Sequence, residues 1–147
     1  IAFGLHPAFI DKHHIDKISE LEKYTQTHNT KLIGEIGLDK RFKNYDRQID
    51  IFTKQVNIAN NLHKPIIIHS VKSHNEIKII KDSKFKHGGI IHAFNGNAEI
   101  ARTYIELGFK LGIGGLLINP NTNLKNVLKK ISIENILLET DSTDMKP

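Results

Sequence analysis

The sequence predicts an α/β fold in which short parallel strands alternate with helices. Six apolar, strand-prone segments alternate strictly with five segments of helical periodicity, at roughly 25–30 residues per strand–helix unit. A helix after each strand is the connection that parallel strands require. No linker, repeat or low-complexity tract interrupts the pattern, so residues 1–147 are expected to form a single domain.

The first half of the chain contains three of the expected strands. Its strands and helices are expected, in chain order, at Ile1–Leu5, Ile15–Thr27, Lys31–Leu38, Tyr45–Leu62 and Pro65–His69. The segment 45–62 has the strongest helical pattern, because Ile49, Phe52, Val56 and Ala59 form one apolar stripe.

The second half repeats the alternation and ends in two carboxylates. Its elements are expected at Ser73–Lys81, Gly89–Ala93, Ala98–Leu107, Phe109–Ile113, Asn123–Ile131 and Ile136–Leu138. The last strand is apolar on both faces and runs into Glu139 and Asp141. A carboxylate at the end of a buried strand needs a metal, a cation or hydrogen bonds to compensate its burial, so Asp141 is a candidate functional residue.

Two architectures fit this alternation, a doubly wound open sheet and a (β/α) barrel. A doubly wound nucleotide-binding domain usually has a Gly-rich fingerprint after its first strand, whereas this chain has His6-Pro7-Ala8. Ionisable side chains are instead expected at or just past the C-terminal ends of five of the six strands, namely His6, Glu35, His69, His92 and Asp141. In a barrel these strand ends meet at one rim, where imidazole and carboxylate groups together suit a divalent cation.

Composition restricts the possible chemistry. The chain has no cysteine, so disulfides and thiolate metal sites are excluded. Twenty-one Lys and Arg against sixteen Asp and Glu give a net charge of +5, which mildly favours anionic partners, although the basic residues are scattered. No apolar run approaches the roughly 20 residues that span a bilayer. We expect a cytoplasmic protein with no membrane association and no obligate protein partner.

Six motifs in order resemble the TatD family of metal-dependent hydrolases, commonly deoxyribonucleases. They are Gly4-Leu5-His6-Pro7, Gly34-Glu35-Ile36-Gly37-Leu38-Asp39, Pro65-Ile66-Ile67-Ile68-His69-Ser70, Ile91-His92-Ala93-Phe94-Asn95-Gly96, Gly112-Ile113-Gly114-Gly115 and Leu138-Glu139-Thr140-Asp141. The resemblance implies a TIM-type (β/α)8 barrel, present here as about six βα units. It also implies two divalent metal ions, of Mg, Mn or Zn.

The resemblance assigns roles to individual residues. Glu35 resembles the carboxylate shared by both metal ions, His69 and His92 the ligands of one ion, and Asp141 the ligand of the other. Glu35 and Asp141 are thus the candidate catalytic residues, with Asp141 beside the attacking water. Three further positions are candidate substrate contacts. His6 and Glu139 match positions near the family's site, where they could instead support the metal ligands. The positive charge of Lys72 could hold a substrate phosphate.

The expected function is metal-dependent hydrolysis of phosphodiester bonds, with DNA as substrate in a 3′–5′ exonuclease-like reaction. One alternative keeps the metal site but acts on an ester or amide, such as an aminoacyl-tRNA. A second alternative is an inactive, incomplete fragment. The chain begins inside a strand at Ile1 and stops just after Asp141, so it is expected to be truncated at both ends and to lack the family's opening His-x-His.

Overall fold

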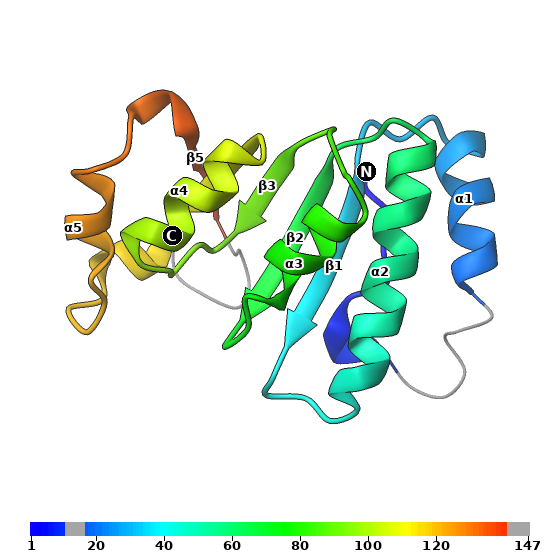
Figure 1. Cartoon of the computed structure of the whole chain (residues 1–147), viewed down its shortest axis with the longest axis horizontal. Coiled ribbons are helices and arrows are strands. Elements are labelled where there is room, and N and C mark those ends of the chain that lie inside the picture. The colour runs from blue at the N-terminus through cyan, green and yellow to red at the C-terminus, as the bar shows by residue number, and fades with distance from the viewer. Residues whose placement is uncertain (11–16, 141–147) are drawn as a thin grey trace. The chain divides into compact units, whose positions relative to one another are not determined.

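A computed structural model describes residues 1–10 and 17–140 of the chain (Figure 1). The chain divides into two compact units, Ile1–Gly89 and Ile90–Pro147. Both units are built from parallel strands and intervening helices, which is the α/β class predicted from the sequence. No helix within the described ranges is long and apolar enough to cross a bilayer.

The first unit contains two paired strands and three α-helices. Its elements are the 3-10 helix η1 (Pro7–Phe9), α1 (Ile18–Thr27), β1 (Ile33–Asp39), α2 (Tyr45–Asn61), β2 (Ile66–Val71) and α3 (Asn75–Asp82). Strands β1 and β2 are parallel, with Gly37 opposite His69. The N–H of Ile66, at the start of β2, donates to the carbonyl of Gly88 at 3.1 Å.

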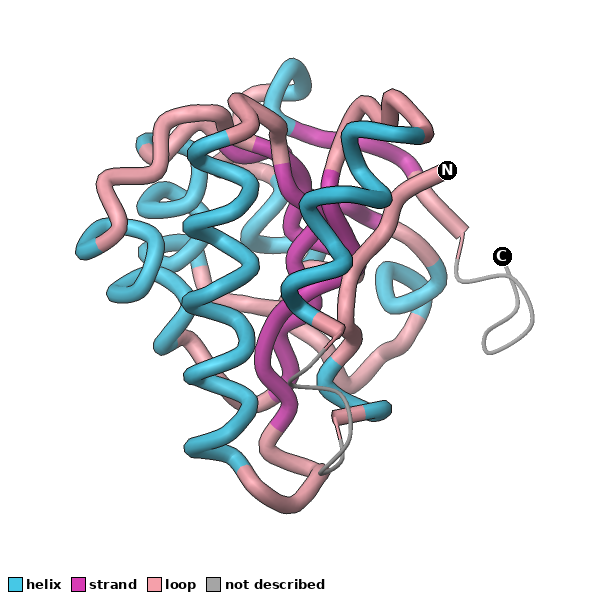
Figure 2. The backbone as a smooth tube through the Cα atoms, turned by 90° about the vertical axis from the view of Figure 1, so that its right-hand side faces the viewer, coloured by secondary structure: helices cyan, strands magenta, loops and turns pink. Residues whose placement is uncertain are grey.

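The core of this unit lies between β1 and α2. Every side chain in it is fully buried: Ile33, Ile36, Leu38, Ile51, Phe52, Val56, Ala59, Ile66 and Ile68. Helix α2 packs on β1, and α1 packs on α2; Figure 2 shows helices running alongside the strands. Burying a whole Ile or Phe side chain stabilises a fold by about 1.5–3 kcal/mol, so this layer is the main source of stability for the unit.

The strand expected at Ile1–Leu5 is wrong as a full strand. The segment makes one isolated parallel bridge, between Phe3 and Ile33. Beyond Phe3, the backbone of Leu5 bonds to a side chain instead of a strand: its N–H donates to Oε1 of Gln55 at 2.7 Å, and Nε2 of Gln55 donates to its carbonyl at 3.2 Å. Pro7 then starts the turn η1, which ends the extended segment.

A second buried glutamine of α2 makes the same kind of contact. The N–H of Asp39, at the end of β1, donates to Oε1 of Gln48 at 2.8 Å, and Nε2 of Gln48 donates to the carbonyl of Asp39 at 3.1 Å. Gln48 and Gln55 lie two turns apart on the buried face of α2 and are both fully buried. Helix α2 thus holds two chain segments, one ending beside His6 and the other at Asp39.

The second unit contains three strands in the sheet order β3-β4-β5. Its elements are β3 (Gly89–His92, whose first residue closes the first unit), α4 (Ala98–Glu106), β4 (Phe109–Ile113), η2 (Gly115–Ile118), α5 (Leu124–Leu128), η3 (Ile133–Asn135) and β5 (Ile136–Leu138). Strand β4 is parallel to β5, and Ala101, Tyr104, Phe109 and Leu111 form the buried core.

Most expected helices are confirmed, with shifted ends. Helix α3 begins at Asn75 rather than Ser73, and α5 is shorter than the expected 123–131. The start of the helix expected at Ile15 lies outside the described residues, and α1 is seen from Ile18. Helix α4 ends before Gly108, whose φ of 86° is the left-handed conformation that stops a helix.

Candidate metal centre

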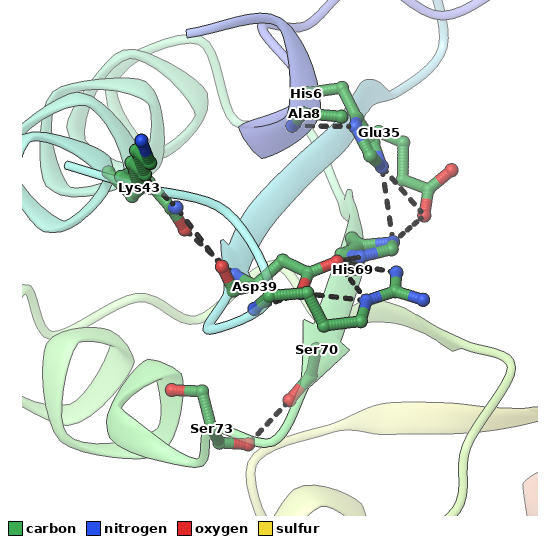
Figure 3. Close-up of polar contacts among 10 residues, drawn as sticks. His6, Ala8, Glu35, Asp39, Lys43, His69, Ser70 and Ser73 are labelled. Atoms are coloured by element: carbon green, nitrogen blue, oxygen red, sulfur yellow. Dashed lines mark hydrogen bonds and ion pairs between the residues drawn. The ribbon is translucent and has the colours of Figure 1, made fainter. Parts of the chain in front are cut away.

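Three predicted site residues of the first unit converge on one point. Glu35 lies on β1, His69 on β2, and His6 immediately before η1. Nδ1 of His69 is 2.9 Å from Oε1 of Glu35 and 3.1 Å from Nε2 of His6. Nε2 of His6 is 3.9 Å from the same Glu35 oxygen. Figure 3 shows the three side chains pointing toward one another.

Close approach of the two strands places Glu35 beside His69. Gly37 has a φ of +153°, and a Cβ built on it would lie 1.9 Å from the carbonyl oxygen of His69. A side chain at position 37 would therefore push β1 away from β2. The peptide bond between Gly34 and Glu35 is cis.

The hydrogen bonds of His6 determine which of its ring nitrogens carries the proton. The N–H of Ala8 donates to Nδ1 of His6 at 3.1 Å, so Nδ1 presents a lone pair. In the neutral ring the proton is then on Nε2, the nitrogen that faces His69 and Glu35. His6 therefore offers a hydrogen-bond donor to the cluster.

Asp39 lies on the other side of the His69 ring. Its Oδ2 is 2.9 Å from Nε2 of His69, and the side chain is fully buried. Nε of Arg41 donates to both carboxylate oxygens at 3.0 Å, and Nη2 donates to Oδ2 at 2.6 Å. Burial alone would raise the pKa of Asp39, but the hydrogen bonds from Arg41 and His69 outweigh it and lower the pKa to about 2. Asp39 is therefore ionised and can only accept hydrogen bonds.

The cluster fits a divalent cation. Ligand atoms of His6, Glu35 and His69 all lie within 4.8 Å of one another, and no other group of three metal-ligating side chains occurs in the two described ranges. Burial would lower the pKa of His69, but hydrogen bonds to Glu35 and Asp39 raise it, so the site favours positive charge at this position. A cation held by Glu35 and His69 supplies that charge, and nitrogen and oxygen ligands suit Zn²⁺ or Mn²⁺.

The remaining predicted residues belong to other segments of the chain. His92, in the second unit, has its Nδ1 3.0 Å from Oε2 of Glu139, whose Oε1 accepts the N–H of Ala93 at 2.5 Å. A Cβ on Gly112 would lie 2.4 Å from this Glu139 carboxylate, which packs against the strand backbone. Lys72 is exposed at the end of β2. Asp141 lies outside the described residues.

Sequence reasoning missed several residues around the cluster. Asp39 ends β1 and so has the strand-end placement that identified the other candidates, but it received no role. Arg41, Gln48 and Gln55 act through atom-to-atom contacts that no sequence motif indicates. The helical stripe of α2 did not identify its two glutamines as buried, because glutamine is mostly exposed in proteins.

Comparison with known proteins places the chain in a family. The family model described as TatD related DNase matches residues 1–147. The uncharacterized metal-dependent hydrolase YjjV of Escherichia coli K12 is 31% identical over 150 residues, which cover 98% of this chain and 58% of that protein. The uncharacterized metal-dependent hydrolase MJ1582 of Methanocaldococcus jannaschii is also 31% identical and is covered to the same 58%.

Solved structures agree with the sequence comparison. The crystal structure of the Escherichia coli TatD homologue YjjV superposes with a TM-score of 0.89 at 30% identity, over 98% of this chain and 58% of that one. A TatD family hydrolase from Entamoeba histolytica superposes with a TM-score of 0.77 at 25% identity, over 95% of this chain and 49% of that one. The chain thus spans about half to three fifths of the length of these relatives. Its strands and helices correspond to part of a TIM-type barrel. The chain belongs to the TatD-related DNase family.

Proposed function

We propose that the protein hydrolyses phosphodiester bonds of DNA with the help of divalent metal ions, as a 3′–5′ exonuclease. The convergence of Glu35, His69 and His6 carries this proposal, since it brings two candidate ligands and a hydrogen-bond donor close together. The family description supports DNA as the substrate. A bound divalent ion would polarise the scissile bond and lower the pKa of a water molecule toward neutrality.

The residues of the chain have separate tasks in this proposal. Glu35 and His69 would hold the first ion, and His92 is proposed as a further ligand. Asp141 is the proposed ligand of a second ion and the acceptor of the proton from the attacking water. His6 donates its Nε2 hydrogen to a phosphate oxygen, which stabilises negative charge that develops during the reaction. Glu139 orients the ring of His92.

A basic loop after β1 supports a nucleic-acid substrate. Lys40, Arg41 and Lys43 are exposed directly after Asp39, and Phe42 between them is 40% exposed. The Arg41 guanidinium lies 5.8 Å from the centre of the Phe42 ring. Cations attract the phosphate backbone and an exposed aromatic ring can stack on an unpaired base, so this loop and Lys72 suit a single strand that approaches the metal centre.

The test is cleavage of end-labelled single-stranded DNA in the presence of Mg²⁺, Mn²⁺ or Zn²⁺. We expect Glu35→Gln to lower the rate by at least about two orders of magnitude, because it removes a ligand carboxylate. Glu22→Gln, an exposed glutamate on α1, is the matched control and should leave the rate unchanged. Equal rates for Glu35→Gln and the wild type would refute the proposal. Turnover of an aminoacyl ester well above that of DNA would instead assign the site to ester hydrolysis.

A further inference from the structure

We infer that Asp39, held by Arg41, is a positioning residue that fixes the tautomer of His69 and thereby directs its Nδ1 lone pair into the metal centre. The inference rests on the proposed metal-dependent function and names a residue outside the predicted ligand set. It follows from the two different neighbours of the His69 ring nitrogens, which face Asp39 on one side and Glu35 on the other.

The first step concerns the charge state of Asp39. The carboxylate is fully buried, yet three hydrogen bonds from the Arg41 side chain and one from the Arg41 N–H at 2.9 Å compensate its charge. A carboxylate in this arrangement stays ionised and accepts hydrogen bonds only. Nε2 of His69, at 2.9 Å, must therefore carry the proton of the shared hydrogen bond.

The second step concerns the opposite side of the ring. With the proton on Nε2, the neutral His69 ring has its lone pair on Nδ1, which faces Oε1 of Glu35 at 2.9 Å. Nδ1 of His69 and Oε1 of Glu35 are then both acceptors, and two acceptors at this distance repel unless a cation or a proton lies between them. A divalent ion with both atoms as ligands removes the repulsion.

The third step concerns how Asp39 itself is held. Gln48 bonds to both the N–H and the carbonyl of Asp39, and its Nε2 also donates to the carbonyl of Lys43 at 3.3 Å. The carboxylate is thus fixed by Arg41 and the backbone by Gln48, so the orientation of the His69 ring depends on packing that is complete before metal binds. Such supporting residues typically contribute a factor of 10–100 to metal affinity.

The direct test needs no substrate. In Zn²⁺-loaded protein labelled with ¹⁵N-histidine at pH 8, long-range ¹⁵N–¹H correlation spectra should show His69 with its proton on Nε2 and none on Nδ1. Asp39→Leu should lose this preference, and the control Asp46→Asn, at an exposed position on the first turn of α2, should keep it. A wild-type His69 with its proton on Nδ1 would overturn the inference.

Metal affinity is the second measurement. Titration calorimetry with Zn²⁺ should give a dissociation constant about 10–100 times weaker for Asp39→Leu than for the wild type. Arg41→Gln, at a position where the side chain is about half exposed, should weaken binding in the same direction if Asp39→Leu fails to fold. Unchanged affinity in a folded variant would contradict the inference. Because neither measurement uses DNA, a failure of the proposed nuclease function is recognised separately.

Discussion

Glu76 is a fully buried carboxyl group in the first turn of α3, away from the candidate ligands in sequence. Burial raises its pKa from 4.5 to about 7, against the smaller opposing effects of its own backbone and of the Ser70 and Ser73 side chains. The folded protein therefore binds a proton at Glu76 more tightly than the unfolded chain does. At pH values above 4.5 this difference destabilises the fold, and the loss is complete above pH 7.

We predict that Glu76→Gln removes a pH-dependent loss of stability. Between pH 5 and pH 8 the free energy of unfolding of the wild type should fall by up to about 3 kcal/mol more than that of the variant, since one pKa unit corresponds to about 1.4 kcal/mol. Urea unfolding at both pH values measures the difference. The exposed Glu22→Gln is the control. Parallel pH dependences of Glu76→Gln and the wild type would show that Glu76 titrates normally.

At the residue scale, the sequence identified candidate site residues better than it identified the residues that form hydrogen bonds with them. The strand-end rule selected Glu35 and His69, and the structure places them 2.9 Å apart. The predicted strand-end position was wrong, however, because Glu35 lies inside β1 and His69 inside β2. The rule also applies to Asp39, but a buried carboxylate is recognised only when its compensating guanidinium is seen in contact with it. Sequence spacing cannot show which nitrogen of a histidine faces which partner, so the tautomers became visible only in the structure.

At the element scale, α2 contributes both apolar packing and buried amide groups. Its periodicity was sufficient to predict a helix at Tyr45–Leu62, close to the observed bounds Tyr45–Asn61. No such periodicity was available for Ile1–Leu5, where the apolar character of the residues was the only indication of a strand. Whether such a segment becomes a strand depends on its hydrogen-bond partner, and here the partner is Gln55 rather than a neighbouring strand.

We predict that Gln55→Leu destabilises the fold by about 1–3 kcal/mol, because the partly buried N–H and carbonyl of Leu5 would lose their hydrogen-bond partners. Leucine is close in size to glutamine, so the comparison measures the loss of hydrogen bonds rather than the loss of side-chain volume. The control is Gln26→Leu at an exposed position of α1. Thermal or urea unfolding gives the free energies. A loss no larger than that of the control would mean that water replaces the amide.

At the scale of the whole molecule, metal binding and stability should be linked. Glu35 and His69 both belong to the unit Ile1–Gly89 and occupy neighbouring strands, so an ion held by them joins β1 to β2. A ligand that binds only the folded state stabilises it by about 2.7 kcal/mol at 100 times its dissociation constant.

We therefore predict that Mn²⁺ raises the midpoint of thermal unfolding in a concentration-dependent way. The rise should be much smaller in Glu35→Gln, which lacks the ligand carboxylate, and unchanged in Glu22→Gln. Differential scanning calorimetry with increasing Mn²⁺ provides the measurement. Equal shifts in Glu35→Gln and the wild type would place the stabilising ion elsewhere on the molecule.

The contact between Leu5 and the α2 glutamine also has a consequence for biosynthesis. His6 leaves the ribosome before its partners, because the partner of its neighbour Leu5 follows 50 positions after Leu5 and His69 follows 63 positions after His6. A nascent chain that has exposed α1 but not yet β2 cannot hold an ion between Glu35 and His69. The ligand pair is completed when β2 emerges, so we expect metal to be acquired after the first unit has been synthesised rather than to guide its earliest folding steps.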